Sequence, residues 1–133
     1  MEMNRFFVKL FLCYAVVAGS LFFAAPGAFA AHTLTVAPPS GQADIGSSVN
    51  FVATATCTAG PCSTIGFGVL GLDPNITPTY STTSCAPTCS TIITLTVGSG
   101  TAPGPYTLTV DAGGQTAPYA LTVIDPNAGV PVN

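Results

Sequence analysis

The sequence predicts an all-β domain of seven short strands that pack as two sheets, and three observations lead to this prediction. Apolar and polar residues alternate repeatedly after residue 30, which is the period of a strand with one buried face. Glycine, proline, asparagine and serine separate the alternating segments, as turn-forming residues do. The same part of the chain shows no apolar residues at helical spacing.

Seven segments carry the alternation. They are His32–Ala37, Ser48–Cys57, Ser63–Leu70, Ile76–Thr82, Thr91–Val97, Pro105–Asp111 and Pro118–Ile124. In the second segment, for example, Phe51 and Ala53 would share one face while Thr54 and Thr56 occupy the other. Because such alternation leaves each sheet one wet face, we expect two sheets packed face to face. Seven strands of this kind in about a hundred residues are typical of an immunoglobulin-like β-sandwich.

The first thirty residues differ from the rest and predict a cleavable secretory signal peptide. Arg5 and Lys9 precede the apolar stretch Leu10–Ala25, and the small residues Ala28 and Ala30 follow it at the positions that a signal peptidase recognises. A membrane anchor is the alternative, but the apolar stretch is slightly shorter than the roughly 20 residues of a bilayer span. Cleavage after Ala30 would leave 133 − 30 = 103 residues.

We therefore expect a signal peptide over residues 1–30, a sandwich domain over 31–125 and a flexible tail over 126–133. The part after residue 30 contains no Lys, Arg or Glu, so four aspartates carry all of its side-chain charge: Asp44, Asp73, Asp111 and Asp125. Binding to nucleic acid or to anionic lipid requires Lys or Arg. We therefore expect no nucleic-acid partner, and no membrane anchor after cleavage.

Four cysteines remain after the predicted cleavage: Cys57, Cys62, Cys85 and Cys89. An even number in a short exported chain predicts two disulfides. A metal site is the alternative, but the two spacings differ from the C-x2-C pairs that dominate zinc sites, so we expect no metal and no cofactor. Local pairs, Cys57–Cys62 with Cys85–Cys89, compete with nested bonds, Cys57–Cys89 with Cys62–Cys85. The sequence leaves this choice open.

Three stretches, Gly41–Val49, Gly71–Thr77 and Ala102–Val110, resemble the Ig-like domains of bacterial and archaeal secreted and cell-surface proteins. The resemblance implies that the first stretch leads into the second strand, that the second leaves the third strand, and that the third forms a corner before the sixth strand. This sequence differs from the family pattern in two features. Such domains usually occur in tandem, whereas this sequence contains one, and antibody domains have a single disulfide, whereas two are predicted here. Tyr106 opens the sixth strand after a turn, which predicts a tyrosine corner.

Catalysis requires a base, an acid or a metal, and the residues after position 30 offer few candidates. Their one histidine, His32, lies beside the predicted cleavage point, where we expect a solvated imidazole at a fraying end. No Ser–His–Asp or Cys–His set is expected to come together, so we predict that the protein is not an enzyme. Asp73 and Asn75 predict a turn, and Asn75 also begins an Asn-x-Thr sequon, which makes it a glycosylation candidate.

Threonine pairs with one residue between them recur along the predicted strands: Thr33/Thr35, Thr54/Thr56, Thr94/Thr96 and Thr107/Thr109. Their side chains would point to solvent because the intervening residues point inward. β-propensity alone accounts for such threonines. Three functional interpretations compete with it: attachment of O-linked glycans, a flat ligand-binding face, and a packing face for neighbouring subunits.

Taken together, these features predict a non-enzymatic structural or interaction module that is secreted or held at the extracellular surface. Our first hypothesis is a subunit of a surface assembly or filament, whose partners would be copies of itself that bind through the first strand or the threonine-rich faces. The alternative is a stand-alone adhesion domain for a glycan or a cell-surface protein. Tyr80 is the aromatic residue that we nominate for such a binding site.

Overall fold

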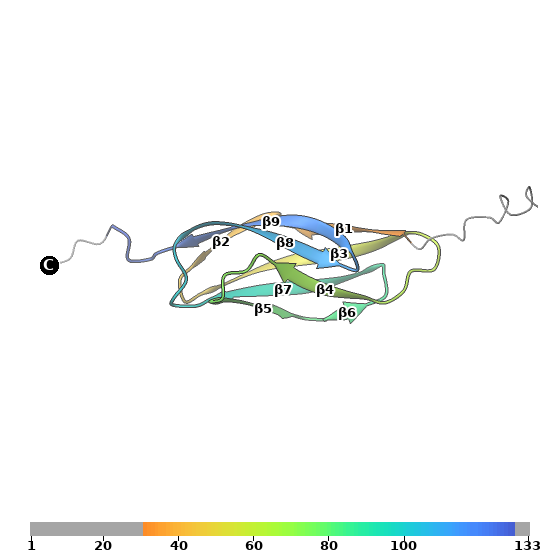
Figure 1. The fold of residues 1–133 in the computed structure, drawn as a ribbon, viewed down its shortest axis with the longest axis horizontal. Coiled ribbons are helices and arrows are strands. Elements are labelled where there is room, and N and C mark those ends of the chain that lie inside the picture. Colours follow the sequence, from red (N-terminus) through yellow and green to blue (C-terminus); the bar gives the residue numbers. More distant parts are fainter. Residues whose placement is uncertain (1–30, 130–133) are drawn as a thin grey trace, which may run out of the picture.

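The computed structural model describes residues 31–129 and shows two stacked β-sheets (Figure 1). The strands are β1 (Ala31–Ala37), β2 (Ser40–Asp44), β3 (Ser48–Ala59), β4 (Ile65–Leu70), β5 (Ile76–Tyr80), β6 (Ser84–Cys85), β7 (Cys89–Val97), β8 (Gly104–Ala112) and β9 (Gln115–Ile124). The described residues contain no helix. The signal peptide predicted for residues 1–30 and the last four residues of the predicted tail lie outside the described residues.

The strands form one sheet of four and one sheet of five. The four-stranded sheet has the order β1-β3-β7-β5 and is antiparallel throughout. The five-stranded sheet has the order β2-β9-β8-β4-β6, in which β2 runs parallel to β9. The antiparallel parts match the ABED and CFG sheets of an immunoglobulin-like sandwich. The prediction of an all-β, two-sheet sandwich is therefore confirmed.

The predicted number of strands is wrong, because the structure has nine strands instead of seven. All seven predicted segments overlap observed strands, and the two that were missed are β2 and β6. In β2 only Ala43 is buried, so this strand lacks the apolar alternation by which the others were found. It forms because its backbone pairs with β9, from Ser40 opposite Ala120 to Asp44 opposite Ile124. Strand β6 has two residues and pairs with the start of β4.

The first predicted strand continues into the second sheet. Strand β1 pairs with β3 of its own chain from Ala31 to Ala37. The chain then crosses at Pro38 and Pro39, which lack the amide protons that a strand interior needs, and enters the other sheet as β2. The amide of Ala120 in β9 donates to the Pro39 carbonyl at 3.0 Å, which holds the crossing segment against the five-stranded sheet.

Alternate side chains of the two sheets fill the space between them. The largest fully buried side chains are Tyr119, Phe51, Ile93, Leu95, Leu108 and Leu121. Tyr119 and Phe51 stack across the core with ring centroids 4.0 Å apart. Gly41 of β2 lies against Tyr119: a Cβ there would overlap the Tyr119 hydroxyl and would lie 2.8 Å from Val49 Cγ2. The absence of a side chain at Gly41 therefore allows β2 to cover Tyr119.

Candidate functional site

The outer side of the four-stranded sheet is a largely polar surface without charge, which we call the hydroxyl face. Its side chains alternate along each strand with inward-facing residues, which are half-buried in β1 and mostly buried in β3 and β7. Its polar members are Thr33, Thr35, Ser48, Asn50, Thr54, Thr56, Thr77, Thr79, Ser90, Thr94 and Thr96. Three of the four threonine pairs noted in the sequence lie on this face, whereas Thr107 and Thr109 lie on β8 of the other sheet.

Strand register orders these side chains in rows across the sheet. Ser48 of β3 lies opposite Thr96 of β7, which in turn lies opposite Thr77 of β5. The hydroxyls of Ser48 and Thr96 are 3.2 Å apart and form a hydrogen bond. At the other edge, Thr35 of β1 lies opposite Thr54. Each row is set by backbone pairing, so the hydroxyl groups form a regular array on the sheet.

One row in the middle of the hydroxyl face is apolar. It consists of Ala37 in β1, Val52 in β3 and Ile92 in β7, which are successive register partners. Val52 is 37% exposed and Ile92 is 49% exposed. The other two large apolar side chains that are exposed, Leu70 and Ile124, lie on β4 and β9 of the opposite sheet and are not register partners. The apolar row is therefore the contiguous exposed apolar feature of the described sheets.

The carboxylates lie away from the hydroxyl face. Asp44 ends β2, Asp111 is on β8, Asp73 is in the turn between β4 and β5, and Asp125 follows β9. Two of them therefore belong to the five-stranded sheet and two to loops. The described residues contain no Lys or Arg, so nothing in this region offsets their negative charge.

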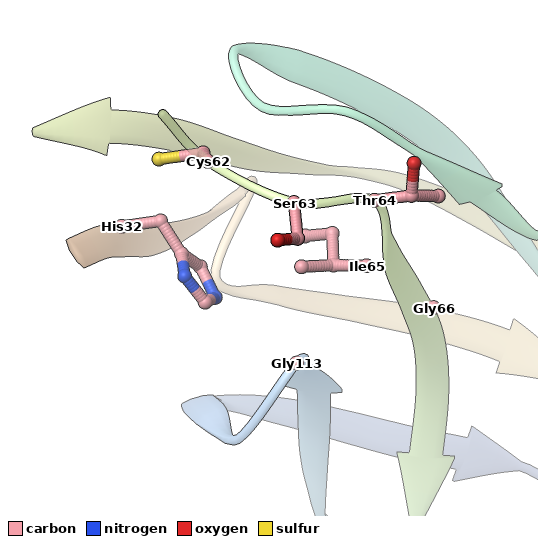
Figure 2. A pocket seen from close by; sticks show the side chains of 7 residues that line it. All are labelled: His32, Cys62, Ser63, Thr64, Ile65, Gly66 and Gly113. Atoms are coloured by element: carbon pink, nitrogen blue, oxygen red, sulfur yellow. The ribbon is translucent and has the colours of Figure 1, made fainter. Parts of the chain in front are cut away.

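A pocket of about 400 Å³ opens at one end of the sandwich (Figure 2). Its lining consists of His32, Cys62, Ser63, Thr64, Ile65, Gly66 and Gly113. His32 Nε2 donates to the Ala112 carbonyl at 2.7 Å and so connects β1 in one sheet with β8 in the other. The expectation of a solvated imidazole at a fraying end is therefore wrong. The hydrogen bond reflects tertiary packing that no local sequence signal indicates.

The pocket offers little chemistry. The imidazole of His32 already uses one nitrogen in its bond to Ala112, and the polar side chains beside it are the hydroxyls of Ser63 and Thr64. No carboxylate lines the pocket to pair with the imidazole, as general acid–base catalysis by a His–Asp pair would require. Within residues 31–129 no group of three or more His, Cys, Asp or Glu side chains is placed to hold a metal ion. The part of the chain that the structure describes also has no helix of the length and hydropathy that crossing a membrane requires.

The structure pairs the cysteines locally. Cys57 bonds Cys62 with 6.0 Å between their Cα atoms, and Cys85 bonds Cys89 with 6.3 Å between theirs. The disulfides close two loops and do not join β3 to β7. A hydrogen bond connects the loops instead, because the amide of Cys57 donates to the Thr88 hydroxyl at 3.2 Å.

Two predicted residues stabilise turns. The Tyr106 hydroxyl donates to the Ala102 carbonyl at 2.7 Å, which is the bond of a tyrosine corner. Asn75 lies in a turn whose Asp73 carboxylate accepts from the Asn75 amide at 2.9 Å. The Asn75 side chain also donates to the Gly100 carbonyl at 3.3 Å, so it ties the turn before β5 to the turn before β8. Asn75 is exposed, and its glycosylation remains a prediction.

Tyr80, nominated as an exposed aromatic binding residue, packs against the core. Burial raises the pKa of its phenol, and a hydrogen bond with the Val69 backbone partly opposes that rise. The reason lies in the strand: Ile76 and Tyr80 are four residues apart in β5 and so point to the same, inner side. The sequence contains this signal, because alternation from the apolar Ile76 places Tyr80 inward.

No protein-family model and no curated protein matches this sequence. Among solved structures, the chain is similar to domains 4 and 5 of the S-layer protein SbsC, with a TM-score of 0.57 and 17% identity over 74% of this chain and 54% of that one. It is also similar to domains 1–6 of surface layer protein SbsC, with a TM-score of 0.58 and 19% identity over 80% of this chain and 14% of that one. The matched part of this chain therefore spans about half the length of the first structure and about a seventh of the second. At this level of identity the similarity establishes a shared β-sandwich fold.

Proposed function

We propose that this chain is a non-enzymatic, exported structural module of an extracellular surface assembly. The hydroxyl face carries this proposal. It is a regular surface four strands wide, it has no charge, and an exposed apolar row crosses its middle. A rigid face of this kind suits repeated packing against protein better than recognition of a small molecule, which favours concave sites.

Three further observations support the proposal. SbsC, whose domains have a similar fold, is a surface layer protein by its description. The two disulfides suit an oxidising extracellular compartment. His32, the histidine of the described region, makes an inter-sheet hydrogen bond and has no carboxylate partner in its pocket. The rival adhesion hypothesis depended on Tyr80, which packs against the core.

Localisation in the producing cells tests the proposal. Intact cells are labelled with an antibody against residues 31–129, and material sheared from the surface is pelleted and imaged by negative-stain electron microscopy. We expect surface labelling, and assembled material that contains the protein. A chain that lacks residues 1–30 is the control, and it should stay inside the cell. Recovery of the wild-type protein only as free monomer in the medium would contradict the proposed function.

A further inference from the structure

We propose that the hydroxyl face binds the same face of a second copy of this chain. The inference rests on the proposed function and adds to it the identity of the contact surface. Charge, exposed apolar area, hydrogen-bonding capacity and size each support it.

The distribution of negative charge favours contact between two copies through their hydroxyl faces. Each copy carries four aspartates after residue 30 and no Lys or Arg to offset them. These carboxylates belong to the five-stranded sheet or to loops. Two copies that meet through the four-stranded sheets therefore leave Asp44 and Asp111 outside the contact, whereas contact through the five-stranded sheets would bring carboxylates such as Asp111 together.

The apolar row supplies a centre for the contact. Val52 and Ile92 remain 37% and 49% exposed, and they lie side by side as register partners in the two central strands of the sheet. An interface commonly has an apolar centre inside a polar rim. Here the row has uncharged polar side chains on both sides, the hydroxyls of Thr54 and Ser90 on one and the Asn50 amide and Thr94 hydroxyl on the other.

Hydroxyl groups also make the face complementary to itself. A threonine or serine hydroxyl both donates and accepts, so two identical arrays can pair without a chemically different partner. A two-fold contact requires this property, since the same patch must serve on both copies. A surface lined by Lys alone or by Asp alone would repel its own copy.

The size of the face predicts how strong the contact is. Four strands about 4.8 Å apart, each presenting about 26 Å of extended chain, make a surface of roughly 500 Å². Two such faces would bury roughly 1,000 Å² in total, which is near the lower limit for a specific contact between proteins. We therefore expect weak association of an isolated pair, which contacts through other faces would have to reinforce in an assembly.

Sedimentation equilibrium of the exported, cleaved protein tests the inference. Ile92→Glu places a charge in the apolar row, and Leu70→Glu places the same charge at an exposed apolar position of the opposite sheet. We expect concentration-dependent dimers of the wild type up to about 1 mM protein, where weak contacts are measurable. Ile92→Glu should lower the association constant at least tenfold, and Leu70→Glu should leave it unchanged. Circular dichroism and urea unfolding check that both variants fold.

Two further measurements address the geometry. A mixture of Ile92→Glu with Ile92→Lys should associate more strongly than either variant alone, because opposite charges would meet across the contact. Thr79→Glu, on the edge strand β5, is a second variant of the same face that removes no apolar contact, and it too should weaken association. Association that is insensitive to Ile92→Glu and Thr79→Glu, or a mixture that stays monomeric, would overturn the inference.

The outcomes separate this inference from the proposed function. Surface assemblies that persist in cells producing Ile92→Glu would exclude the hydroxyl face as the contact and leave the structural role intact. A wild type that is monomeric at 1 mM and also absent from surface material would refute both. Specific binding of cell-surface glycans by the wild type, abolished by Ile92→Glu in the absence of dimers, would assign the face to a glycan and refute self-association.

Discussion

Two tyrosines provide a matched test of how the fold is stabilised, because removal of the same atom should have opposite effects. Tyr106→Phe and Tyr119→Phe each delete one hydroxyl group. The Tyr106 hydroxyl donates to the Ala102 carbonyl at 2.7 Å. Loss of such a bond costs about 1 kcal/mol, and the cost stays near this value because the exposed Ala102 can turn its carbonyl to water.

The Tyr119 hydroxyl is in the opposite situation. Tyr119 is fully buried, and its hydroxyl has no hydrogen-bond partner among the described residues. A buried hydroxyl without a bond costs about 1–3 kcal/mol of desolvation. Removal of the Tyr119 hydroxyl keeps the ring stacked on Phe51 and avoids this desolvation cost. It also leaves a small gap beside Gly41, which offsets part of the stability gained. We expect Tyr119→Phe to be neutral or to stabilise the domain by up to about 1 kcal/mol.

Urea unfolding followed by circular dichroism measures both effects. A small domain has a slope of about 1–3 kcal/mol per molar urea, so Tyr106→Phe should lower the midpoint by a few tenths of a molar or more. Tyr119→Phe should leave the midpoint unchanged or raise it. An unchanged midpoint in Tyr106→Phe would show that the corner bond does not stabilise the domain. A loss of about 1 kcal/mol or more in Tyr119→Phe would show that its hydroxyl is bonded, for instance to a buried water.

Two other predictions concern the core, one concerns the disulfides and one concerns the cleaved chain. Gly41→Ala should destabilise the domain by about 1–3 kcal/mol through overpacking against Tyr119. The double variant with Tyr119→Phe should recover part of this stability in urea unfolding. An unchanged urea midpoint in Gly41→Ala would contradict the close approach of Gly41 to Tyr119. Burial raises the pKa of Tyr119, so unfolded tyrosines ionise before the folded one, and stability should be full below about pH 10 and fall above it. The urea midpoint should therefore decrease less between pH 8 and pH 11 in Tyr119→Phe than in the wild type. An equal decrease in both proteins would show that Tyr119 ionisation is not the cause. A chymotryptic digest without reducing agent should separate the two cysteine pairs, and fragments that stay linked until reduction would indicate bonds between β3 and β7. Trypsin should leave the exported protein uncut even in urea because no Lys or Arg follows residue 30. A tryptic cut after Arg5 or Lys9 would show that residues 1–30 are retained and would disprove the predicted cleavage after Ala30.

The period of the strands, the sign of the charge and the local turns all follow from the amino-acid sequence without tertiary information. Alternation placed all strands except β2 and β6, because an apolar residue at every second position must turn to the core. Turn chemistry is equally local: Tyr106 bonds a carbonyl four residues away, and Asp73 bonds an amide two residues away. The cysteine spacings left two pairings open, and the structure has the local one.

Tertiary structure alone decided the features that join distant segments. Strand β2 has no alternation of its own and exists because β9 supplies its backbone partners. His32 would be solvated if β1 stood alone, but the stacked sheets bring it to the Ala112 carbonyl, 80 residues away. The apolar row exists only after register aligns Ala37, Val52 and Ile92 from three strands. Such contacts depend on which strands become neighbours, and local periodicity carries no information about that choice.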